Sequence, residues 1–294
     1  MHIAASIRGI VREYAPRPLA RAARYAPRAA LDVLDALGRR RDPLTPPRRL
    51  MNDGSINGEH FRGDGDQFLR HFVELGDLSP HHDVLDIGCG IGRKAVPLTR
   101  HLDHSASYYG IDIAEAGVKW CQRNISTRFP NFNFAHIKDP SVGRGFEPVD
   151  RWGRFRFHFD NDSFDFVFLS SVFTHMQPDA VVHYLREIAR VLRPDGTIFA
   201  TYFLLNDQSE CLISSGSSAF DFRHDFVGFR TITRAHPEDA IAYPEDVVHQ
   251  MYDQVGLTQN YRTYYGSWPG RTEYTSFQDI IIAGMPRMVS SAPI

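Results

Sequence analysis

The stretch Val84-Leu85-Asp86-Ile87-Gly88-Cys89-Gly90-Ile91-Gly92-Arg93 decides the fold of this chain. A short apolar run ends in an acid, and glycines then follow at every second position. We interpret Val84 to Ile87 as a buried parallel strand. The glycines let the backbone turn sharply and approach a ligand without a Cβ in the way. The residues that follow read as a helix, whose free N–H groups would point at the same spot. The stretch therefore predicts a nucleotide-like cofactor at the carboxyl end of a sheet.

The spacing of the glycines separates two kinds of cofactor site. The dinucleotide fingerprint G-x-G-x-x-G would need its third glycine at position 93, where the chain has Arg93. The pattern is instead D-x-G-x-G-x-G, with Asp86 two residues before the first glycine. This pattern resembles motif I of the class I S-adenosylmethionine-dependent methyltransferases.

Later segments strengthen this resemblance. Tyr108 to Ile113 reads as a second strand ending in Asp112, an acid placed to accept hydrogen bonds from two ribose hydroxyls. Phe164 to Met176 resembles the fourth strand of the family and the loop that reaches the reacting centre. Arg193-Pro194-Asp195-Gly196-Thr197 resembles the "L-R-P-G-G" turn into the fifth strand, with Asp195 in place of the first glycine. These elements occur in the right order over residues 60–284, so the resemblance covers most of the chain.

The fold class predicted is α/β. We expect a doubly wound, mostly parallel seven-stranded sheet with an antiparallel last strand, helices on both faces and a small cap built from insertions. Strands are expected near 83–88, 107–112, 132–137, 164–170, 197–204, 259–265 and 278–284. Helices are expected near 92–102, 115–128, 178–192 and 244–256, after a first helix that ends near Leu75. Two long insertions, Asp139 to Phe159 and Asn206 to Tyr243, should lie on the carboxyl side of the sheet, where the family builds its acceptor pocket.

Composition places the chain among ordinary globular enzymes. Its 294 residues can bury one sizeable core. The three cysteines, Cys89, Cys121 and Cys211, have no C-x-x-C spacing, which argues against a disulfide framework and against structural zinc. We therefore expect a reducing, cytoplasmic compartment. No run of eighteen apolar residues is present, so no transmembrane helix is expected.

The charge is unevenly spread, which sets an N-terminal arm, 1–50, apart from a methyltransferase domain, 51–294. The arm holds 11 Arg and 4 acidic residues, a net charge of +7. Because the chain has 33 basic and 35 acidic residues, the remainder carries 22 against 31, a net charge of −9. Prolines leave room for two short helices, Ile3 to Tyr14 and Arg28 to Leu37, before a Pro43 to Arg49 linker.

The arm admits two interpretations. It is either a functional arm, which contacts anionic lipid at the inner face of a membrane or an acidic partner, or a solvated tail. The tail is favoured because no uninterrupted amphipathic helix is visible. The acidic body argues against nucleic acid as a partner, and strand four, Ser170-Ser171-Val172-Phe173, lacks the Asn/Asp-Pro-Pro-Tyr type of motif. The oligomeric state is left open.

The resemblance assigns most of the candidate cofactor residues. Residues expected around the methionine half of S-adenosyl-L-methionine are Asp86, Gly88, Cys89, Gly90 and Arg93. Residues expected along the adenosine half and at the end of strand four are Asp112 for the ribose, Ile113 and Asp139 for the adenine, and Ser170 for backbone contacts. The alternatives are a tight turn without a ligand for the glycines and a helix N-cap for Asp112.

Arg62 is a further cofactor candidate that the residues themselves suggest. It lies in an Arg-Gly-Asp-Gly stretch that we interpret as a loop before the first core helix. A guanidinium there would grip the cofactor carboxylate in bidentate fashion. The alternative is a solvated surface arginine.

The chemistry expected is in-line methyl transfer, in which alignment supplies much of the rate. A hydroxyl acceptor must also lose its proton, and His175, just past strand four, is the candidate base. Alternatively, His175 caps the following helix or packs under the pocket. Residues expected to recognise the acceptor are His224, Asp225, Tyr265 and Trp268, because aromatic faces beside polar groups suit a sugar and suit a polyketide almost as well. No metal is predicted, since the histidines and acids match no ligand spacing.

The leading hypothesis is an O-methyltransferase that acts on a small molecule, with a sugar or glycolipid hydroxyl as the acceptor. The run Ser171-Val172-Phe173-Thr174-His175-Met176 and the late "Y-G-x-W…S-F-Q-D" resemble bacterial methyltransferases that act near glycan or lipid assembly. Two alternatives stay open. One is N- or C-methylation of a secondary metabolite, and the other is a cofactor-binding protein without catalysis.

Overall fold

The computed structural model describes residues 28, 31–32, 42–51, 57–137 and 156–286. Seven strands form the main sheet in the order β10-β11-β5-β4-β1-β2-β3. β11 is antiparallel to both neighbours, and the other pairs are parallel. This confirms the predicted sheet. The strand bounds are β1 Val84–Ile87, β2 Tyr108–Asp112, β3 Phe132–His136, β4 Phe164–Leu169, β5 Leu192–Tyr202, β10 Gln259–Tyr264 and β11 Asp279–Gly284.

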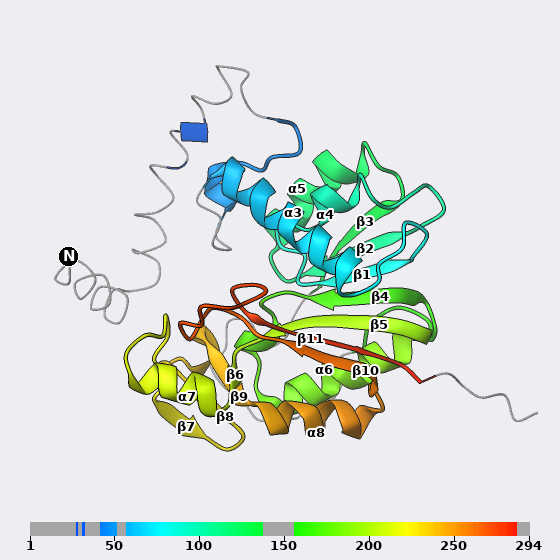
Figure 1. Cartoon of the computed structure of the whole chain (residues 1–294). Coiled ribbons are helices and arrows are strands. Elements are labelled where there is room, and N and C mark those ends of the chain that lie inside the picture. The colour runs from blue at the N-terminus through cyan, green and yellow to red at the C-terminus, as the bar shows by residue number, and fades with distance from the viewer. Residues whose placement is uncertain (1–27, 29–30, 33–41, 52–56, 138–155, 287–294) are drawn as a thin grey trace, which may run out of the picture.

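Helices cover both faces of this sheet (Figure 1). α3 (Gly58–Glu74), α4 (Ala95–Leu98) and α5 (Glu115–Cys121) lie on one face, and α5 continues as a π-helical turn to Ser126. α6 (Pro178–Val191) and α8 (Glu245–Val255) lie on the other face. The connections after β1 and β4 leave the sheet on opposite faces, which makes the carboxyl ends of these two adjacent strands the switch point where such folds bind ligands.

Burial of apolar side chains explains how the layers hold together. α6 buries residues three or four positions apart, among them Val181, Leu185 and Ile188, as an amphipathic helix on a sheet must. On the opposite face Phe72 of α3 packs on Phe168 of β4, with ring centroids 4.5 Å apart. Helices therefore cover both faces of the sheet next to the switch point.

Two predicted helix boundaries are wrong. The helix expected over 92–102 is reduced to α4, because the residues before it form turns and Pro97 lies within it without a backbone N–H to donate. The first helix begins at Gly58, because the side chain of Asn57 accepts a hydrogen bond from the His60 N–H at 2.9 Å and caps it. Arg62 thus lies inside α3 and not in a loop.

The second insertion folds into a small unit beyond the carboxyl end of β5, which we call the cap, residues 204–244 (Figure 1). Its strands have the order β6-β9-β8-β7, and its helix α7 begins at an Asn206–Ser209 capping box. This confirms the expected cap and its place on the carboxyl side. The bounds are β6 Leu204–Leu205, α7 Asp207–Ser214, β7 His224–Phe226, β8 Phe229–Thr231, η5 Pro237–Asp239 and β9 Ile241–Pro244.

The linker expected over Pro43 to Arg49 packs onto the domain where the structure describes it. Thr45, Pro46 and Pro47 are buried, and Asp32, only 4% exposed, forms an ion pair with Arg49 at 3.0 Å. The predicted helix Ile3 to Tyr14, most of Arg28 to Leu37 and most of the first insertion lie outside the described residues. Within the described part, no helix is both long and apolar enough to cross a membrane.

Candidate cofactor and acceptor site

The glycine bend follows β1 and is held by the neighbouring strand. The N–H groups of Gly88 and Cys89 both donate to the carbonyl of Ile111, at 2.8 and 3.1 Å. Gly88 has φ +85°, and a Cβ there would lie 2.4 Å from Cγ2 of Val172. A Cβ at Gly90 would meet no atom within 4 Å, so the space over the bend is open. The backbone is thus free to approach a ligand at this point, as the sequence predicts.

Asp112, at the end of β2, ties the bend to the next strand. One carboxylate oxygen accepts from the Gly90 N–H and the other from the Ala114 N–H, both at 2.6 Å. Ala114, and not Asp112, is the N-cap residue of α5. Two ionised oxygens offer about four acceptor sites, so Asp112 keeps capacity for ribose hydroxyls. Ile113 follows it and is 46% exposed, which leaves an apolar side chain available to flank an adenine ring.

Asp86 lies beneath the bend and not in it. Its side chain is 1% exposed and accepts a hydrogen bond from the Tyr108 hydroxyl at 2.6 Å. Burial raises the pKa of Asp86 to about 7, against a lowering influence from Tyr108 and from the nearby Lys94 ammonium. Lys94 is itself buried, with Nζ 5.0 Å from the centroid of the Phe68 ring. Neither Tyr108 nor Lys94 was predicted as a partner of this acid.

We expect Asp86→Asn to change how stability depends on pH. The folded-state pKa of Asp86 is about 7 against an ordinary 3.8, so the folded state binds the proton more tightly. Stability is then lost as the pH rises between these values, by up to about 1.4 kcal/mol per pH unit. An Asn side chain does not ionise. The free energy of unfolding of the variant, relative to the unmutated chain, should therefore rise from pH 5 to pH 7 and level off above. Urea titrations at pH 5, 6, 7 and 8 measure this, and parallel curves would contradict it.

The remaining residues predicted near the cofactor include two arginines, Arg93 and Arg62, whose side chains contact other residues of the chain. Arg93 donates to Asp64 of α3 at 2.9 Å. Arg62 donates one hydrogen bond to the Thr45 hydroxyl, also at 2.9 Å, and its contact with the cofactor carboxylate stays a prediction. Cys89 is 3% exposed, and burial raises the pKa of its thiol well above the ordinary value. Asp139 lies outside the described residues.

Polar side chains gather at the end of β4, next to Ser170, which the resemblance predicts for backbone contacts with the cofactor. Ser170 is 8% exposed, and the next residue, Ser171, has φ +60°. The Ser171 N–H donates to the Thr201 hydroxyl oxygen at 2.8 Å. The hydroxyls of Ser171 and Thr201 both donate to Oε1 of Gln278, at 2.9 and 2.7 Å. We call Ser171, Thr201 and Gln278 the polar platform.

His175 ends the short 3-10 helix η4 (Phe173–His175) and is exposed. Its Nδ1 lies 2.8 Å from the backbone carbonyl oxygen of Glu238 in the cap. In a neutral ring Nδ1 is then the donor, which leaves Nε2 as an acceptor. The buried Tyr243 hydroxyl donates to the Met176 carbonyl. The cap therefore fixes both the histidine ring and the backbone after it.

The predicted acceptor residues are only partly brought together. His224 and Asp225 lie on β7, three strands from β6 and so roughly 14 Å away at ordinary strand spacing. Asp225 pairs with Arg230 at 2.6 Å. Tyr265 is 38% exposed and donates to Glu245 at 2.8 Å. The cap edge is thus distant from the end of β5, whereas Tyr265 is nearer to it.

Trp268 requires a correction. Its side chain is 0% exposed, with the rings of Phe203 and Phe222 packed against it at 5.3 and 5.4 Å between centroids. Its indole N–H donates to Asp279 at 2.6 Å. A ring covered in this way has no open face for an acceptor, so Trp268 is a core residue that joins the cap to the loop between β10 and β11.

Asp279 is the centre of a buried polar cluster. It is 0% exposed and also accepts from the backbone N–H groups of Leu204 and Gly266, at 2.8 and 2.7 Å. The Arg271 guanidinium lies 3.0 Å from it and stacks 4.8 Å from the centroid of the Tyr265 ring. This cluster connects β11, the start of the cap and the β10–β11 loop.

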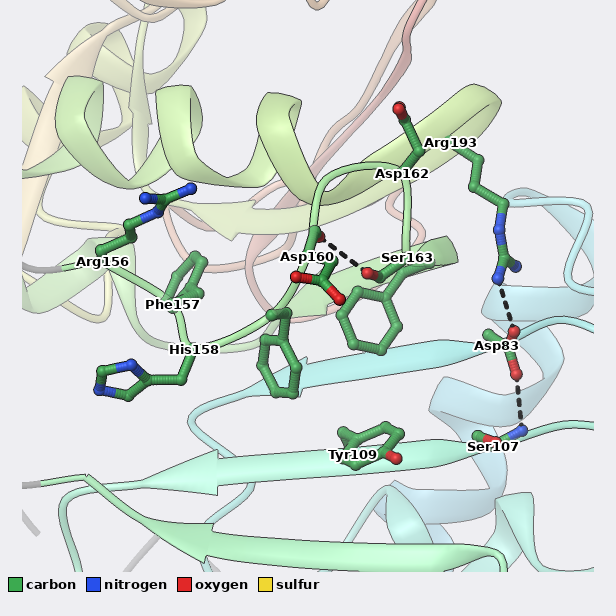
Figure 2. Close-up of a pocket in the computed structure, with 12 residues that line it drawn as sticks. Asp83, Ser107, Tyr109, Arg156, Phe157, His158, Asp160, Asp162, Ser163 and Arg193 are labelled. Atoms are coloured by element: carbon green, nitrogen blue, oxygen red, sulfur yellow. Dashed lines mark hydrogen bonds and ion pairs between the residues drawn. The ribbon is translucent and has the colours of Figure 1, made fainter.

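A cavity of about 760 Å³ lies elsewhere on the sheet (Figure 2). Its lining includes Asp83 and Ser107, which come just before β1 and β2, and the exposed ring of Tyr109. Arg193 reaches Asp83 at its rim, at 2.8 Å. These residues mark the amino ends of the strands, opposite to the glycine bend, so this cavity is not the cofactor site. Among the described residues, no group of three or more His, Cys, Asp or Glu side chains is arranged to hold a metal ion.

Comparisons with known proteins agree with this geometry. Residues 85–200 match the profile of the family Methyltransf_11, described as a methyltransferase domain. The chain is 36% identical over 124 residues to the phthiotriol/phenolphthiotriol dimycocerosates methyltransferase of Mycobacterium tuberculosis (strain ATCC 25618 / H37Rv), which is 42% of this chain and 37% of that protein. It is 31% identical over 132 residues to the nocamycin O-methyltransferase of Saccharothrix syringae, 45% of this chain and 41% of that protein. The chain thus spans well under half the length of these curated relatives.

Solved structures share the fold at low sequence identity. A protein from Pyrococcus horikoshii OT3 superposes with a TM-score of 0.52 at 14% identity, covering 81% of this chain and 95% of that one. A SAM-dependent methyltransferase from Methanosarcina mazei superposes with a TM-score of 0.50 at 18% identity, covering 73% and 97%. Residues 85–200 therefore match a methyltransferase domain, and the chain shares the fold of these solved structures.

Proposed function

We propose that this chain transfers the methyl group of S-adenosylmethionine to a hydroxyl of a small lipid or glycolipid acceptor, with His175 as the base. The observation that carries the cofactor assignment is the glycine bend, open above Gly90 and tied to Asp112. The backbone from Gly88 to Gly90 would lie against the methionine half of the cofactor. Asp112 would hold the ribose. When bound, the cofactor supplies an electrophilic methyl group on a positively charged sulfur.

The relatives support an oxygen acceptor of this kind. The mycobacterial relative is named for phthiotriol and phenolphthiotriol dimycocerosates. The relative from Saccharothrix syringae is named as an O-methyltransferase. In this chain the cap and the β10–β11 loop lie on the carboxyl side, beyond β5, where they can enclose an acceptor next to the cofactor. A sugar hydroxyl and a lipid hydroxyl would use the same chemistry.

The contact between His175 and Glu238 supports the role of His175. A neutral imidazole whose Nδ1–H is engaged by a carbonyl presents Nε2 as the proton acceptor, in a fixed orientation. Removal of the hydroxyl proton by Nε2 as the methyl group is transferred would leave an imidazolium, which the carbonyl of Glu238 stabilises through its hydrogen bond.

Calorimetry with S-adenosylhomocysteine tests the cofactor assignment directly. We expect a dissociation constant in the micromolar range, the usual scale for an enzyme ligand. Transfer of label from S-adenosyl-[methyl-³H]methionine into an organic extract of cells that produce the protein tests the reaction. A protein that fails to bind S-adenosylhomocysteine would refute the proposal.

We expect His175→Ala to lower the turnover of a hydroxyl acceptor by about 100- to 10,000-fold, the usual contribution of a general base. The affinity for S-adenosylhomocysteine should not change. His236→Ala is the matched control, because His236 is an exposed histidine in the cap. Turnover that survives in the His175 variant would point to an acceptor that needs no deprotonation, such as a neutral amine.

A further inference from the structure

We infer that Gln278 is an acceptor-binding residue, whose carboxamide N–H₂ group donates a hydrogen bond to an oxygen of the methyl acceptor. This inference rests on the proposed function and adds to it a residue that reads the chemistry of the acceptor. Gln278 precedes β11 and is half-buried.

The platform holds the carboxamide in one orientation. The Thr201 hydroxyl oxygen accepts the Ser171 N–H, so its own hydrogen is directed to Oε1 of Gln278. The Ser171 hydroxyl donates to the same oxygen. With Oε1 occupied by two donors, Nε2 is left as the group that Gln278 presents, and within the described part of the chain no hydrogen bond engages it. A primary amide nitrogen offers two donors and no acceptor.

The sheet order places this donor on the acceptor side of the cofactor. Asp112 on β2 would hold the adenosine half, and the bend after β1 the methionine half. The next strands along the sheet are β4, β5 and β11. Val172, which contacts Gly88, is adjacent in sequence to Ser171, so the platform continues directly from the bend. The methyl group of a cofactor bound at the bend after β1 would therefore face the end of β4 and the platform.

The chemistry of the platform selects its ligand. A donor-only group pairs with a lone pair, as a hydroxyl, ether or carbonyl oxygen provides, and it is repelled by an ammonium group. The exposed ring of Phe277 lies next in the chain and packs edge-on against Phe203. Gln278 and Phe277 together fit an acceptor that carries oxygen on an otherwise apolar molecule.

Gln278→Glu isolates the donor, because a carboxylate still accepts from Ser171 and Thr201 but has no N–H₂ group. Gln278→Met removes the donor without adding charge. Gln250→Glu, on the exposed side of α8, controls for the charge change alone. The assay measures transfer of label from S-adenosyl-[methyl-³H]methionine into the organic extract, and calorimetry measures S-adenosylhomocysteine affinity for each variant.

We expect both Gln278 variants to lose at least about 10-fold in transfer rate at limiting extract, since a single hydrogen bond contributes about that factor. Their affinity for S-adenosylhomocysteine should stay within about twofold of that of the unmutated chain. Equal transfer by the unmutated chain and both Gln278 variants would overturn the assignment of Gln278 and leave the proposed function standing. A chain that binds S-adenosylhomocysteine but transfers no label would overturn the proposed function, and this inference with it.

Discussion

Asp112→Ala is expected to weaken the binding of S-adenosylhomocysteine by about 100-fold or more. A hydrogen bond from a neutral donor to a carboxylate contributes about 1.5 kcal/mol or more, so two ribose hydroxyls account for about 3 kcal/mol. The substitution also removes the acceptor of the Gly90 and Ala114 N–H groups, which lie 2.6 Å from the carboxylate. The bend after β1 would lose its tie to β2 at the same time.

Calorimetry on the purified variant measures this effect. Asp253→Ala, which removes an exposed carboxylate on α8, is the control and should bind as the unmutated chain does. An affinity loss of less than threefold in the Asp112 variant would mean that the acid at the end of β2 does not contact the ligand. A far-UV circular dichroism spectrum that matches that of the unmutated chain would show that the variant is folded.

Asp279→Ala is expected to lower the free energy of unfolding by about 3–5 kcal/mol. The carboxylate is 0% exposed and accepts from Leu204, Gly266, Trp268 and Arg271. Its removal leaves the Arg271 guanidinium, with a side chain 2% exposed, as a buried charge without its counter-ion. Breaking a buried ion pair from one side costs this amount because the remaining charge stays desolvated.

Asp225→Ala provides the comparison. Asp225 pairs with Arg230 at 2.6 Å, but its side chain is 74% exposed, so we expect a loss of at most about 1 kcal/mol. Urea denaturation of the two variants side by side measures the difference. Equal decreases in the free energy of unfolding of the two variants would contradict the view that the Arg271–Asp279 pair stabilises the fold more because it is buried.

Local patterns in the sequence were sufficient for the sheet and for the cofactor bend. β1 and β11 are short, mostly apolar runs with turn residues beside them, and they lie where their residues predicted. The sequence also predicts that the glycine bend and the acid at the end of β2 lie close together, because parallel strands bring their carboxyl ends to one edge of the sheet. Asp195, in place of a glycine, adopts φ +66° near the start of β5, where the pairing with β4 is irregular, so the turn predicted over 193–197 lies within the strand.

Contacts between distant residues could not be read from the sequence. Trp268 and Asp279 are partners only because the loop between β10 and β11 folds back, so the tryptophan had no visible reason to be buried. Arg62 was assigned to a loop because of its flanking glycines, whereas the Asn57 cap starts the helix before it. Gln278 lies in the late S-F-Q-D run, but its contacts could not be read from that run, because its partners Ser171 and Thr201 come from the end of β4 and from β5.

The pairing of β6 with β9 has an evolutionary consequence. These strands run parallel, and Leu205 lies opposite Pro244, so the chain leaves and re-enters the core at neighbouring points about 5 Å apart. A segment with adjacent ends can be lengthened, shortened or exchanged without displacing the residues on either side of it. The stretch between Leu205 and Pro244 can therefore change in length and sequence, except at residues such as Glu238 and Phe222 that contact the rest of the chain. Under the proposed function, such changes would alter the acceptor while the cofactor bend stays intact.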